Sequence, residues 1–129
     1  MGLQRVRLLV EMTVHEGKLA EFEAIAQQMV EVSQKETGTL GYHFLLSADR
    51  TRCRLIEGYT DAGAIETHFN GPAVREFVPK LLQVASVNRM EVYGDPGPQV
   101  TAMVAGFDAE IFSSWQGCGL KHNFAGSKP

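Results

Sequence analysis

The fold is decided by the stretch VRLLVEMTVHEGKLAEFEAIAQQMVEVSQKE, residues 6–36, whose hydrophobic period changes once. In residues 6–14 the apolar side chains alternate, at Val6, Leu8, Val10, Met12 and Val14. In residues 18–36 a stripe recurs every three or four positions, at Leu19, Phe22, Ile25, Ala26, Met29, Val30 and Ser33. A period of two predicts a strand, and a helical period predicts an amphipathic helix. The stretch therefore predicts a strand and then a helix, which stops at Thr37-Gly38.

The following residues predict a hairpin, a second helical region and a last strand. Residues 40–48, LGYHFLLSA, and 52–60, RCRLIEGYT, read as strands joined by a turn at residues 48–50. So short a link favours an antiparallel hairpin. Asp61 is the expected cap of a helix whose inner side carries Ala64, Ile65, His68 and Phe69. After a break at residues 70–72, Pro72 is placed to start another helical segment, and residues 87–93, VNRMEVY, predict the last strand.

This order predicts an α+β fold, the ferredoxin-like βαββαβ sandwich. A four-stranded antiparallel sheet would carry both helices on one face. Several residues could populate either face, namely Leu9, His43, Leu45, Cys53, Leu55, Tyr59, Met90 and Val92. One helix layer cannot hide so much apolar surface, so we expect a second copy to cover the open face and form a homodimer.

Residues 1–96 form the expected ferredoxin-like domain, and residues 97–129 are an extension of the same domain. The extension should contain a short helix with its apolar positions at Val100, Met103, Val104 and Phe107. Residues 109–115, AEIFSSW, could form a short strand, and residues 117–129 read as a loose tail.

The composition narrows the classes of function. The chain has 129 residues, 44% of them hydrophobic and 21% charged, which suits one globular domain. A net charge of −3 argues against nucleic acid or a membrane surface as a partner. Two isolated cysteines and four scattered histidines predict neither a metal site nor a disulfide framework, and they fit a reducing cytoplasm. We see no signal peptide or membrane span, and no phosphate-binding or dinucleotide-binding glycine motif.

Glu57 and His68 are the candidate catalytic pair. Glu57 interrupts an apolar strand, and His68 lies on the inner stripe of the helix that follows. A helix that packs back over its strand can bring the two side chains together, and a carboxylate beside an imidazole is a plausible acid–base unit. The alternative is that Glu57 pairs with Arg54 or Arg89 and that His68 is a satisfied core or interface histidine.

Amphipathic aromatic side chains suggest a pocket for a small aromatic ligand. Tyr42, His43, Tyr59 and Trp115 each combine an apolar body with a polar tip. The alternative is ordinary core packing, or partner packing for Trp115. Arg52 and Arg54 alternate on one strand and could hold an anionic group, although such residues more often form a solvated strand face.

Four stretches resemble the antibiotic biosynthesis monooxygenase (ABM) family of the dimeric α/β-barrel superfamily. They are GKLAEFEAIAQQMV (17–30), ETGTLGYHFLLSAD (36–49), RLIEGYTDAGAIETHF (54–69) and MEVYGDP (90–96). The resemblance covers residues 6–96 and implies a ferredoxin-like protomer with a pocket between sheet and helices.

The resemblance also implies a function. It predicts a monooxygenase that oxidises a quinol or polyphenol with molecular oxygen and needs no flavin or metal. His68 or Glu57 would take the phenol proton, while Tyr42, His43 and Asn70 would orient the ring oxygens. Haem chemistry is not expected, because residues 72–82 contain no histidine. Two other hypotheses remain open: a non-catalytic or isomerising small-molecule binder on the same fold, and a purely structural interaction module.

Overall fold

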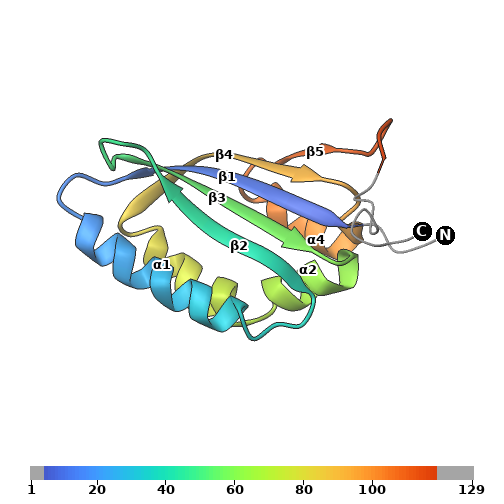
Figure 1. Ribbon diagram of the computed structural model, residues 1–129, viewed down its shortest axis with the longest axis horizontal. Helices are drawn as coiled ribbons and strands as arrows, with labels where there is room; N and C mark the ends of the chain where they lie inside the picture. Colours follow the sequence, from blue (N-terminus) through green and yellow to red (C-terminus); the bar gives the residue numbers. More distant parts are fainter. Residues whose placement is uncertain (1–4, 119–129) are drawn as a thin grey trace, which may run out of the picture.

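A computed structural model describes residues 5–118 and shows the expected ferredoxin-like architecture with one further strand (Figure 1). The elements are β1 (Val6–Val14), α1 (Leu19–Ser33), β2 (Thr39–Leu46), β3 (Arg52–Tyr59), α2 (Ala62–Phe69), η1 (Ala73–Phe77), α3 (Val78–Leu81), β4 (Ala85–Tyr93), α4 (Gly97–Ala105) and β5 (Glu110–Phe112). Most of the predicted loose tail, residues 119–129, lies outside the described residues.

The sheet has the strand order β2-β3-β1-β4-β5. β1 pairs antiparallel with both β3 and β4, and β2 pairs antiparallel with β3. These four strands are the predicted ferredoxin-like sheet. The short strand anticipated in residues 109–115 is present as β5, which runs parallel to β4 and makes the sheet five-stranded.

The helices pack on one face of the sheet, and strand alternation decides which side chains face them (Figure 1). Every second residue of β1, from Val6 to Val14, is buried beneath the helices. The structure assigns to one face or the other the residues that the sequence could place on either. The helix-facing set is Cys53, Leu55, Tyr59, Met90 and Val92, all buried. Leu9, His43 and Leu45 belong to the opposite, open face.

The second helical region is broken more sharply than the sequence pattern suggests. The Asp61 side chain accepts a hydrogen bond from the Ala64 N–H at 2.9 Å, so the predicted cap of α2 is correct. After Pro72 the chain forms a π-helical turn, η1, and only then the short helix α3. Pro79 has no N–H to donate to the carbonyl four residues earlier, so a continuous α-helix cannot form here.

The extension beyond residue 96 completes the edge of the domain. α4 contains three of the four predicted apolar positions, Val100, Met103 and Val104, and the fourth, Phe107, follows the end of the helix. Val100 and Val104 are fully buried, and α4 packs beside α2. Among residues 5–118, no helix has the length and apolar character needed to cross a membrane.

Gly38 sets the approach of α2 to the sheet. A Cβ atom at this position would lie 2.4 Å from the Ala64 Cβ, and the Gly38 carbonyl accepts from the Thr60 N–H at 2.9 Å. We expect Gly38→Ala to lower the free energy of unfolding by about 1–3 kcal/mol, because the helix must move away. Gly41→Ala is the matched control, since its Cβ would meet nothing within 4 Å and should change stability by about 0.5 kcal/mol or less. Urea unfolding measures both; equal losses would contradict the close-packing argument.

Candidate active site

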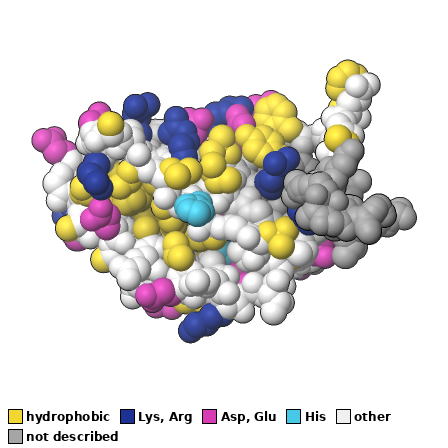
Figure 2. All heavy atoms as spheres, viewed as in Figure 1, with side chains coloured by type: hydrophobic (Ala, Val, Ile, Leu, Met, Phe, Trp, Pro, Cys, Tyr) yellow, Lys and Arg dark blue, Asp and Glu magenta, His cyan; other side chains and the backbone are white. Residues whose placement is uncertain are grey.

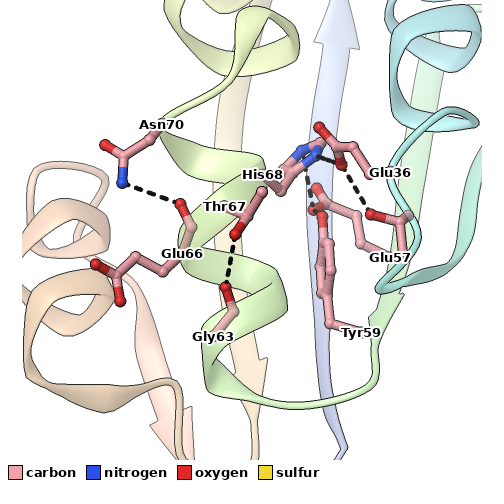
Figure 3. Close-up of polar contacts among 9 residues, drawn as sticks. Glu36, Glu57, Tyr59, Gly63, Glu66, Thr67, His68 and Asn70 are labelled. Atoms are coloured by element: carbon pink, nitrogen blue, oxygen red, sulfur yellow. Dashed lines mark hydrogen bonds and ion pairs between the residues drawn. The ribbon is translucent and has the colours of Figure 1, made fainter.

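His68 is the centre of a buried polar cluster between α2 and the sheet (Figure 3). Its side chain is 1% exposed, and its Nδ1 lies 2.8 Å from Oε1 of Glu36. The same Glu36 oxygen accepts a hydrogen bond from the Thr39 hydroxyl at 2.8 Å. A carboxylate at Nδ1 favours the imidazole tautomer with its proton on that nitrogen. Nε2 is then the nitrogen free to accept a proton.

Glu57 lies below His68 on β3 and is almost fully buried. Its Oε1 accepts a hydrogen bond from the Tyr59 hydroxyl at 2.5 Å and lies 3.9 Å from His68 Nε2. The predicted proximity of Glu57 and His68 is therefore present. Burial raises the pKa of Glu57, and the nearby His68 and the Tyr59 hydrogen bond only partly oppose this effect.

The alternative pairing of Glu57 with an arginine is not what the structure shows. Arg54 lies 3.8 Å from Glu11, and Arg89 pairs with Glu91 and Glu110. These residues alternate with the buried positions of their strands, so their side chains leave the sheet on the open face.

Two tyrosines flank the histidine. The ring centroids of Tyr42 and Tyr59 lie 5.1 and 5.3 Å from that of His68. Burial raises the pKa of Tyr42 well above its ordinary value, and the charges of Glu57 and Glu36 add to the effect. Burial and Glu57 raise the pKa of Tyr59 in the same direction. Both hydroxyls are therefore held as hydrogen-bond donors.

A cavity of about 50 Å³ lies between the sheet and the helices, and the polar cluster forms part of its wall. Its polar lining residues are Tyr42, Glu57 and His68. The rest of the wall is apolar, made of Leu8, Val10, Met12, Met29, Leu55, Phe69, Val74, Val78, Leu81, Leu82, Val87, Met90 and Phe107. The lining suits an apolar molecule with one polar group, and an aromatic ring would enter only if the wall side chains moved apart, because ligand pockets usually hold several hundred Å³. Within residues 5–118 no group of three or more metal-ligating side chains is placed to hold a metal ion.

The structure does not bring four of the predicted substrate-binding residues to this cavity. His43 is exposed on the open face of the sheet, and Arg54 pairs with Glu11 there. Asn70 is exposed, donates to the Glu66 carbonyl at 3.1 Å and accepts from Arg75 at 3.1 Å. Trp115 is 87% exposed and lies beyond β5. Strand alternation explains His43, since its neighbours Tyr42 and Phe44 already face the helices.

Glu36 is the site residue that sequence reasoning missed. It lies in the loop between α1 and β2, 32 residues before its partner His68. Its sequence signals are its place at the start of the family-like stretch 36–49 and just before Gly38, where the chain approaches α2 closely, and neither signal indicates a contact with His68. The contact joins a loop residue to a helix residue 32 positions away, so no periodic pattern in the sequence predicts it.

The comparisons with known proteins agree with this fold. The model of the family described as antibiotic biosynthesis monooxygenase matches residues 5–80, and the chain belongs to this family. Among solved structures it is similar to MupZ from Pseudomonas fluorescens, with 22% identity and a TM-score of 0.77 over 92% of this chain and 97% of that one. It is also similar to SnoaB from Streptomyces nogalater, described as a cofactor-independent oxygenase, with 18% identity and a TM-score of 0.62 over 73% and 95% of the two chains. A comparison with curated proteins gave no match. At these identities the two structures support the fold.

The buried Glu57 predicts a pH-dependent cost in stability. Because its pKa is raised on folding, the folded protein retains a proton that the unfolded chain loses as the pH rises above about 4.5. Stability is then lost with rising pH, up to the raised pKa. Glu57→Gln cannot ionise, so we expect its stability relative to the unsubstituted protein to increase across a pH series that begins near 4.5 and rises from there. Urea unfolding across this range measures the difference, and a difference independent of pH would contradict the assignment.

Proposed function

We propose that this protein is a cofactor-independent monooxygenase that oxidises a quinol or polyphenol with molecular oxygen in the cavity beside His68. Membership of the ABM family and the fold shared with SnoaB support the oxygenase class. The observation that carries the proposal is the cavity itself, an apolar enclosure whose polar lining groups are a base and two proton donors.

The proposed reaction begins with proton transfer. His68 Nε2 takes the phenolic proton, and Glu36 stabilises the imidazolium through the bond to Nδ1. The phenolate transfers an electron to O₂, and superoxide and the ring radical combine at a ring carbon that bears hydrogen to form a peroxide anion. The proton of that ring carbon passes to the outer peroxide oxygen, the C–H electron pair forms the quinone carbonyl, and the O–O bond breaks to release hydroxide. The leaving hydroxide and the proton held by His68 form water, so one oxygen atom enters the product and the other leaves as water.

The apolar wall supports this chemistry physically. A dry cavity strengthens the electrostatic contact between phenolate and imidazolium and limits side reactions of the reduced oxygen. The Phe69 ring lies 6.0 Å from that of His68, and Met90 and Leu55 are further apolar residues of the cavity lining. The substrate itself donates the electrons, so no redox group is required of the protein.

The test is oxygen uptake with a panel of substituted hydroquinones, together with ¹⁸O₂ labelling of the products. We expect His68→Ala to lower the rate by about 10²–10⁴-fold, the range typical of a lost general base. His15→Ala is the matched control, because His15 is a partly exposed histidine bonded to Ser86 at 2.8 Å, away from the cavity residues. Its rate should not change.

Other outcomes would overturn the proposal. If the panel raises the melting temperature but no oxygen is consumed, the cavity binds aromatic molecules without oxidising them. If His68→Ala lowers only the melting temperature and leaves oxygen uptake intact, the histidine is a structural core residue.

We also propose that the open face of the sheet forms a homodimer interface. Leu9, Ile56 and His43 lie side by side on neighbouring strands, since Ile56 is paired with both of the others, and Leu45 extends the patch. Ile56 and Leu45 are 46% and 47% exposed. Figure 2 shows hydrophobic side chains gathered around a histidine on this side of the molecule. A two-fold axis would bring the same apolar patch of two copies together.

Size-exclusion chromatography with light scattering tests the interface. Ile56→Asp should shift the protein from dimer to monomer, because each copy would place an unpaired carboxylate in the apolar interface. Met103→Asp introduces the same charge at an exposed hydrophobic residue of α4 and should leave the dimer intact. A monomer before any substitution, or a dimer that survives Ile56→Asp, would refute the proposed interface.

A further inference from the structure

The three polar groups of the cavity differ in what they can do with a proton. His68 Nε2 can accept one, because Glu36 occupies Nδ1 at 2.8 Å. Tyr42 lines the cavity with its ring 5.1 Å from that of His68, and burial raises its pKa although the Ser33 hydroxyl partly opposes this, so it keeps a phenolic proton to donate. The cavity therefore offers a base and a donor in the same small volume, and neither of them needs oxygen to act.

Glu57 adds a second donor. Its two described contacts, the 2.5 Å bond from Tyr59 and the 3.9 Å approach to His68, both involve Oε1. The other oxygen of this cavity-lining carboxyl is left for a ligand. Burial raises the pKa of Glu57 and so favours the neutral acid, which carries a proton to donate. A carboxyl group kept neutral in an apolar site is a known way to stabilise an enolate oxygen.

We propose that the cavity also catalyses keto–enol proton transfer on an apolar ketone, with His68 as the base and Tyr42 and Glu57 as donors to the carbonyl oxygen. His68 Nε2 removes a proton from the carbon next to the carbonyl, and the C–H electron pair forms the C=C bond of an enolate. The carbonyl π electrons move to oxygen, where the two donors stabilise the charge. Return of the proton from His68 to carbon or oxygen restores the ketone or releases the enol, so no oxidant or reductant is consumed.

The walls of the cavity favour an apolar ketone over a charged keto acid. Its remaining lining is hydrophobic, and no lysine or arginine is among the lining residues. A carboxylate on the substrate would lose its hydration without gaining a cationic partner. A single carbonyl, by contrast, finds two donors in the lining, Tyr42 and Glu57, and apolar surface elsewhere.

Hydrogen–deuterium exchange tests this activity without oxygen. Under anaerobic conditions in D₂O, 2-tetralone and the smaller cyclohexanone would be incubated with the protein, and loss of the α-proton signals would be followed by NMR. We expect exchange faster than in buffer, with a loss of about 10²-fold or more in His68→Ala. Tyr42→Phe should lower the exchange rate by about 10²-fold, as expected when one donor to an oxyanion is missing. His15→Ala should exchange at the rate of the unsubstituted protein.

Glu36→Gln tests whether Glu36 acts by setting the tautomer of His68 or only by filling space in the core. Glutamine can offer its NH₂ group to Nδ1 and so favour the tautomer that leaves the proton on Nε2. We expect exchange to fall by about tenfold or more, with a changed pH profile and little change in melting temperature. Circular dichroism of each variant checks that it is folded.

The outcomes distinguish this activity from the proposed oxygenation. Exchange without oxygen uptake from hydroquinones would support the ketone activity and reject the oxygenase. Oxygen uptake with no exchange above buffer for either ketone would support the oxygenase and reject the ketone activity. Exchange that persists undiminished in folded His68→Ala would overturn the assignment of the base.

Discussion

The hydrogen bond between Glu36 and His68 is the interaction on which the rest of the site depends. It joins the loop after α1 to the buried face of α2, two parts of the chain separated by 32 residues. A histidine placed in an apolar core would be costly without a partner, because an unpaired buried polar group loses its hydration. With this bond made, the imidazole is satisfied on one side and oriented on the other. The same contact therefore makes the cluster tolerable in the core and leaves one ring nitrogen available to the cavity.

The contacts of Glu57 and Tyr59 extend the polar cluster from His68 toward the sheet. Glu57 receives the Tyr59 hydroxyl on the oxygen that faces His68, and the apolar β3 and β1 side chains shield the pair from water. Polar networks in a core stabilise a unique geometry when each member is satisfied. Here the network ends at the cavity wall, where a bound molecule can complete it.

Much of the architecture could be predicted from periodicity. The alternation in residues 6–14 gave β1 its observed bounds, and Asp61 marked the start of α2. The approach of Glu57 to His68 also followed from a strand and the helix packed on it. The aromatic character of His43 suggests a place in the pocket, but its neighbours Tyr42 and Phe44 face the helices. Because side chains alternate along a strand, His43 must lie on the opposite face. Glu36 and the π-helical turn could not be predicted, because one depends on a long-range contact and the other on a backbone hydrogen-bond shift.

The π-helical turn η1 affects how the shape of the cavity can change when the sequence changes. Val74 of η1 forms part of the cavity wall. A π turn holds one more residue per hydrogen-bonded loop than an α turn, and such turns are commonly found at functional sites. Deleting one residue here would let the turn close as α-helix and would change which side chain of η1 faces the cavity. The shape of the cavity is thus open to change by a single-codon insertion or deletion, while the sheet and the His68 cluster keep their sequence.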